Sequence, residues 1–101
     1  MKQSFGEYIR QLREEKKMPL RKLAARLDID QSTLSKIERN ERKAISSMVP
    51  ILAETFKLDY KKLKVRFLSD NIVNYLSQED FPLEVLKVAE QKIEYLIKHK
   101  V

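Results

Sequence analysis

Apolar residues recur at every third or fourth position along almost the whole chain, the spacing that places them on one face of an α-helix. Short polar segments interrupt this pattern at intervals. The helices expected from it are 5–17, 20–27, 31–39, 47–56 and 60–67, followed by a short one over 71–76 and a longer one over 82–98. The pattern therefore predicts an all-α fold, with a five-helix domain over residues 1–68 and a C-terminal helical extension over 69–101.

Residues that commonly cap helices stand at most of the predicted helix ends. Serine and aspartate side chains can accept a hydrogen bond from the free amides of a first helical turn. The expected N-caps are, in chain order, Ser4, Asp30, Ser46 or Ser47, Asp59, and Ser77 or Asp80. Asn40, which tolerates a left-handed backbone, is expected to end the third helix, and Pro82 is expected in the first turn of the last one.

The residue types that are scarce exclude several kinds of chemistry. The chain has no cysteine, one histidine (His99) and one glycine (Gly6), so thiolate catalysis, a cysteine or histidine metal site and a glycine-rich phosphate loop are not expected. Adjacent carboxylates such as Glu14 and Glu15 fit a solvated helix face. We therefore expect no enzyme, no metal and no cofactor. No apolar run approaches ~18 residues and no signal peptide follows Met1, which predicts a cytoplasmic location.

Charge is distributed unevenly along the chain. The formal net charge is +6, of which residues 1–66 contribute +8 (17 basic and 9 acidic side chains) and residues 67–101 contribute −2. A basic domain of this kind favours a polyanionic partner such as DNA. A solvated lysine-rich surface is the alternative interpretation, and charge alone does not separate the two.

One segment carries a specific arrangement of residues. Residues 18–40 read MPLRKLAARLDIDQSTLSKIERN, and they resemble the helix-turn-helix of phage-repressor-like (Cro/repressor, XRE-type) DNA-binding domains. The resemblance continues on both sides, in IRQLREE at 9–15 and LAETFKL at 52–58. It implies a five-helix repressor-like domain that binds double-stranded DNA and regulates transcription.

The resemblance assigns roles to individual side chains. It implies base contacts in the major groove from Gln31, Ser32 and Lys36, because glutamine can pair with adenine and lysine with guanine. The phosphate contacts expected around them are Arg21, Thr33, Ser35, Arg39, Arg42, Lys43 and Ser46. For each residue, an ordinary solvated side chain is the alternative. Arg13 and Glu38 match a structural ion pair of the family, and they are expected to lock the first helix to the third.

Two positions depart from the family pattern. The family usually has glutamine at the start of the second helix, where this chain has Leu20. One phosphate contact is therefore expected to be missing, or Leu20 packs on a thymine methyl group or a partner. The turn usually carries glycine where this chain has Asp28, and aspartate tolerates a positive φ at some cost.

The last predicted helix carries a second apolar pattern. Leu86, Ala89, Ile93 and Leu96 are spaced by three, four and three residues, which is the start of a coiled-coil seam. We expect this seam to form a homodimer interface that places two recognition helices ~34 Å apart on one face of DNA. The alternative is that this helix folds back on its own domain.

These features predict a dimeric transcriptional repressor whose partner is a palindromic or pseudo-palindromic operator. No membrane and no small-molecule effector is expected as a partner. The alternative is a protein-interaction adaptor or antitoxin whose acidic C-terminal helix binds a different protein. A restriction-modification controller, an antitoxin and another kind of regulator all fit the sequence equally.

Overall fold

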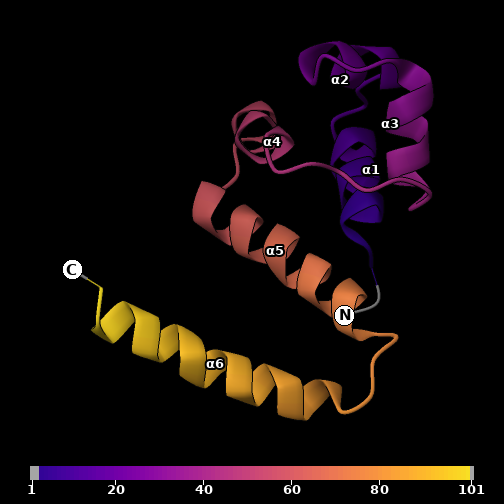
Figure 1. The fold of residues 1–101 in the computed structure, drawn as a ribbon. Coiled ribbons are helices and arrows are strands. Elements are labelled where there is room, and N and C mark those ends of the chain that lie inside the picture. Colours follow the sequence, from indigo (N-terminus) through magenta and orange to yellow (C-terminus); the bar gives the residue numbers. More distant parts are fainter. Residues whose placement is uncertain (1–2, 101) are drawn as a thin grey trace. The chain divides into compact units, whose positions relative to one another are not determined.

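The structure is a computed structural model that describes residues 3–100. Those residues form six α-helices and no strand, which confirms the predicted all-α fold (Figure 1). The helices are α1 (Phe5–Glu15), α2 (Leu20–Arg26), α3 (Gln31–Glu38), α4 (Met48–Phe56), α5 (Tyr60–Leu76) and α6 (Pro82–Lys98). None of these helices is both long enough and apolar enough to span a membrane.

The fifth helix is longer than predicted. The expected break between a helix ending at residue 67 and another beginning at residue 71 is wrong, because α5 runs without interruption from Tyr60 to Leu76. The intervening residues include no glycine or proline, the residues that most often end a helix. The Ser69 hydroxyl donates a hydrogen bond to the Arg66 carbonyl at 3.0 Å, so this polar side chain is satisfied within the helix.

The predicted caps of α1 and α5 are confirmed. The Ser4 hydroxyl accepts from the Glu7 amide at 3.1 Å, and the Glu7 carboxylate accepts from the Ser4 amide at 2.8 Å. Hydrogen bonding by the Ser4 backbone amide, and then by its side chain, lowers the pKa of the Glu7 carboxyl. At the start of α5, the Asp59 carboxylate accepts from the Lys61 amide at 2.9 Å. Both helix starts therefore satisfy amides that have no partner inside the helix.

The predicted caps of α4 and α6 differ from those observed. Ser47 occupies the N-cap position of α4, but its side chain makes no capping hydrogen bond. Phe81, and neither Ser77 nor Asp80, is the N-cap of α6, with a left-handed backbone at φ 58°. The Ser77 hydroxyl instead donates to the Asn74 carbonyl at 3.0 Å. Pro82 lies in the first turn of α6 as predicted.

The hydrophobic core draws on each of the first five helices. Its buried side chains are Phe5, Ile9, Leu23, Ala24, Leu27, Leu34, Ile37, Met48, Val49, Leu52, Ala53, Phe56, Leu63 and Phe67. α3 lies against both α1 and α2. The Phe5 and Phe67 rings meet edge to face with centroids 5.2 Å apart, so α1 and α5 also meet in this core.

The single glycine of the chain lies at a close approach of α1 to the backbone of α3. A Cβ atom placed on Gly6 would lie 1.8 Å from the carbonyl oxygen of Ile37 and 3.4 Å from the Cα atom of Glu38. Both of these atoms belong to the backbone of α3 and cannot move aside as a flexible side chain would. Gly6 therefore sets how closely the first and third helices can pack.

Residue contacts divide the chain into two compact units, one ending at Asp70 and the other beginning at Asn71. The first unit holds α1 to α4 and most of α5. The second unit holds the end of α5 and all of α6. No residue of α6 is buried, so its apolar side chains are exposed within this unit.

Candidate nucleic-acid interface

The turn between α2 and α3 is a tight reversal closed by backbone hydrogen bonds. The Asp28 amide donates to the Ala25 carbonyl at 3.1 Å, and the Ile29 amide donates to the Ala24 carbonyl at 3.0 Å. Asp28 has a φ of 57°, the left-handed conformation in which glycine is usual. The prediction that aspartate adopts a positive φ here is therefore confirmed, and the turn forms without glycine.

Asp30 caps the start of α3, as predicted. Its carboxylate accepts a hydrogen bond from the Thr33 amide at 2.7 Å. That bond is the largest cause of a lowered pKa for Asp30, and the positive charges of Arg42 and Lys36 lower it further. Because the folded pKa is lowered, the cap's contribution to stability is present at neutral pH and is lost as the pH falls through that lowered value.

The buried and exposed faces of α3 are sharply separated. Leu34 is fully buried and Ile37 is 2% exposed, so these two side chains anchor the helix in the core. The three residues predicted to contact bases are all exposed to solvent: Gln31, Ser32 and Lys36. The structure therefore presents all three from one short helix whose opposite face is held in the core.

The end of α3 is fixed by a second left-handed residue. Asn40 has a φ of 62°, and its amide donates to the Ile37 carbonyl at 3.0 Å. The following amide, of Glu41, donates to the Lys36 carbonyl at 2.8 Å. This pair of bonds is the Schellman arrangement, and it confirms that Asn40 ends the helix.

The residues predicted to contact phosphates are mostly on the surface of the same domain. Arg21, Arg39, Arg42, Lys43 and Ser46 are exposed, and Thr33 and Ser35 are half-buried. Arg39 is not a free cation, because its Nε atom pairs with the Glu41 carboxylate at 2.9 Å and its guanidinium also donates to the Ser35 hydroxyl. The ion pair raises the pKa of Arg39 and lowers that of Glu41. A phosphate contact by Arg39 therefore exchanges one anionic partner for another.

Arg13 and Glu38 form a partly buried ion pair between α1 and α3. Arg13 Nε and Nη2 donate to the two Glu38 carboxylate oxygens at 2.8 and 2.9 Å, and Nη1 donates to the Met18 carbonyl at 2.9 Å. The Glu38 hydrogen bond is the main cause of a raised pKa for Arg13. With side chains 14% and 4% exposed, neither partner is available to DNA. Their role is to hold α3 against α1.

Two further contacts were not expected from the sequence. Leu20 is half-buried and packs against the hydrophobic core, so part of its side chain is already covered by its own domain. The Lys64 ammonium of α5 donates to the Ser46 hydroxyl, across 18 residues of sequence. No local pattern indicates this second contact, because its two partners belong to different elements.

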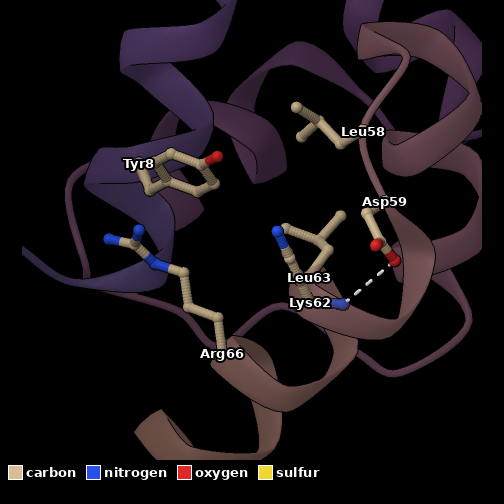
Figure 2. Close-up of a pocket in the computed structure, with 6 residues that line it drawn as sticks. All are labelled: Tyr8, Leu58, Asp59, Lys62, Leu63 and Arg66. Carbon is tan, nitrogen blue, oxygen red and sulfur yellow. Dashed lines mark hydrogen bonds between the residues drawn. The ribbon is translucent and has the colours of Figure 1, made fainter.

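A cleft of about 230 Å³ lies between α1 and α5 of the first unit. Figure 2 shows the side chains around it. Its lining residues are Tyr8, Leu58, Asp59, Lys62, Leu63 and Arg66. The Arg66 guanidinium lies 3.9 Å from the centre of the Tyr8 ring, and it also donates to the Gln3 side chain at 3.0 Å. None of the residues predicted to contact DNA lines this cleft. In residues 3–100 no group of three or more histidine or acidic side chains could hold a metal ion.

Comparison with known protein families supports the local geometry. A family model described as a helix-turn-helix domain matches residues 6–65, which is more than half of the chain. The matched span runs from the start of α1 into α5 and includes the whole α2–turn–α3 segment. No curated protein and no solved structure gave a match.

Proposed function

The chain belongs to the helix-turn-helix domain family and is a DNA-binding regulator, and from this premise we propose that it is a dimeric repressor of the phage-repressor-like type. In this proposal α3 enters the major groove of a palindromic or pseudo-palindromic operator in the cytoplasm. The proposed action is binding alone, without a catalytic step, a metal, a cofactor or a small-molecule effector.

The observation that carries the proposal is the exposure of Gln31, Ser32 and Lys36 on a helix held by buried Leu34 and Ile37. A glutamine amide can pair with adenine through two hydrogen bonds, and a lysine ammonium can donate to guanine. These side chains leave the same face of α3, so they would meet neighbouring base pairs. The exposed basic residues around them would supply phosphate contacts that position the helix.

Alanine at Gln31 or at Lys36 is expected to relax the preference for one base pair and to cost about 1–3 kcal/mol of binding free energy.

Arg42→Ala should instead weaken binding to all sequences alike and flatten the slope of log K against log salt by about 0.9, because one phosphate contact is lost. In vitro selection of bound duplexes first defines the operator, and anisotropy titrations at several salt concentrations then measure each variant. If the Gln31 and Lys36 variants keep the wild-type affinity and base preference, the assignment of α3 is wrong.

The exposed seam of α6 supports the dimeric part of the proposal. Leu86, Ile93 and Leu96 are 39%, 55% and 66% exposed, and Ala89 completes their coiled-coil spacing. Apolar side chains aligned in this way lose contact with water when two such helices pair. A single short recognition helix makes few base contacts, and a dimer would double their number.

Aspartate at both Ile93 and Leu96 is expected to convert the dimer into a monomer, because four charges would then lie along the paired seam. Sedimentation velocity measures the change in mass directly. Gln91→Asp, on the polar face of the same helix, is the matched control and should leave the dimer intact. A double variant that sediments like wild type would mean that these two side chains do not form the interface.

A second candidate function is an adaptor or antitoxin whose C-terminal helix binds a different protein. The observation that favours it is the additional apolar surface of α6 outside the seam, where Val88 and Tyr95 are 47% and 63% exposed. Such a protein should elute from size exclusion with a stoichiometric partner of another sequence. A homodimer that elutes alone and binds its operator would contradict this candidate.

A further inference from the structure

We propose that Lys64 of α5, a helix outside the helix-turn-helix, contacts the DNA phosphate backbone together with Ser46. The inference rests on the proposed DNA interface and extends it from α3 and the following loop to a third element. Lys64 was not among the residues expected from the sequence, and its position is defined by contacts in the fold.

Lys64 is held at one place on the surface. Its ammonium donates to the Ser46 hydroxyl, and its side chain is half-buried. The ammonium also lies 5.9 Å from the centre of the Phe67 ring, one turn further along α5. A free surface lysine loses side-chain entropy when it binds a phosphate, and a lysine that is already ordered loses less of it.

Within residues 3–100, the charge of Lys64 has no anionic partner of its own. The three ion pairs found in residues 3–100 are Arg10–Glu14, Arg13–Glu38 and Arg39–Glu41, and none of them includes Lys64. A hydroxyl group accepts one of the three ammonium protons but neutralises no charge. The start of α4, next to Ser46, carries a partial positive charge and does not compensate an ammonium either. The cation therefore remains available to an incoming anion.

Lys64 also extends a set of cations that already belongs to the proposed interface. Ser46 follows Arg42 and Lys43 in the loop between α3 and α4, and both of these residues are exposed. The hydrogen bond to Ser46 joins Lys64 to this loop. A duplex whose major groove receives α3 presents phosphates on both sides of the groove, and cations on this loop and on Lys64 can contact them.

Lys62 provides a matched control on the same helix. It is also a lysine of α5, but it lines the cleft between α1 and α5, which Tyr8 and Arg66 line as well (Figure 2). Lys62→Gln and Lys64→Gln remove the same charge from the same helix and differ in the surface that loses it. Because the net charge changes equally in both variants, a difference in their DNA binding must come from where the charge was removed.

The test measures binding of the full chain to its selected operator as a function of salt. Lys64→Gln is expected to reduce the slope of log K against log salt by about 0.9, with the base preference unchanged. Lys62→Gln should keep the wild-type slope, and Lys64→Arg should restore it. Circular dichroism of each variant checks that the fold is intact.

The outcomes separate this inference from the proposed function. If the wild-type protein binds its operator and Lys64→Gln keeps the full slope, the inference is overturned while the proposed function stands. An equal loss of slope in Lys62→Gln, or a changed base preference in Lys64→Gln, overturns it as well. If the wild-type protein prefers no duplex at any salt concentration, the proposed function itself fails.

Discussion

Gly6→Ala is expected to lower the free energy of unfolding by about 3 kcal/mol or more, although alanine normally stabilises a helix relative to glycine. The reason is the approach of α1 to α3, where the added Cβ would lie 1.8 Å from the Ile37 carbonyl oxygen. That oxygen accepts a hydrogen bond from the Asn40 amide, and this bond helps to end α3. The two helices must therefore separate, and the end of α3 is disturbed with them. Urea unfolding followed by circular dichroism measures the loss.

Arg10→Ala is the control for the Gly6 substitution. Arg10 lies one turn further along α1, is exposed, and pairs only with Glu14 on the same helix. Alanine there should change stability little, because exposed ion pairs within a helix contribute weakly. A Gly6→Ala protein as stable as wild type would show that α1 and α3 do not pack this closely.

The ends of α1 and α3 are set by neighbouring residues and were predicted well, unlike the N-caps of α4 and α6. Ser4 and Glu7 stand three residues apart, which is the spacing of a capping box, and both partners are visible in the sequence. Asp30 and Asn40 likewise act on backbone groups within a few residues of themselves. The ends of α1 and α3 could therefore be predicted without knowing which helices pack together.

The length of α5 was mispredicted for a physical reason. Leu63 and Phe67 are buried, whereas Leu68 and Ile72 are 44% and 47% exposed, so the apolar face changes along the helix. When only the spacing of apolar residues is considered, a shift of the apolar face along one helix looks like the end of one helix and the start of another. The backbone continues because each peptide group can still bond within the helix, and Asp70 and Asn71 are tolerated there.

The Arg13–Glu38 pair joins residues 25 apart and was expected only from the family resemblance, and two other features set by distant residues were not predicted. The sequence shows a glycine at position 6 but not which atoms lie against it, because Ile37 belongs to another helix. The contact between Lys64 and Ser46 also joins two elements that spacing alone does not bring together. For the candidate interface, the exposure of α3 followed from its apolar positions, but the extension to α5 required the fold.

Glu38→Ala is expected to cost about 3–5 kcal/mol of unfolding free energy, because it leaves the partly buried Arg13 charge without its anion. The side chains of Glu38 and Arg13 are 4% and 14% exposed. Only the Met18 carbonyl would remain as a partner for the guanidinium. The pair raises the pKa of Arg13, so the stabilisation that comes from the arginine charge is fully present below the ordinary arginine value and is lost as the pH rises through the raised value. Urea unfolding measures the loss, and Glu41→Ala, which breaks an exposed pair, should have a small effect.

The double variant Arg13→Met, Glu38→Leu should recover most of the stability that Glu38→Ala loses. Apolar side chains of similar size fill the same space, and no unpaired charge remains between α1 and α3. Since neither residue is a proposed DNA contact, operator affinity and base preference should stay close to wild type. If the double variant is as unstable as Glu38→Ala, unpaired charge is not the cause of the loss. If it is stable but no longer binds the operator, the ion pair orients α3 for binding as well as holding it in place.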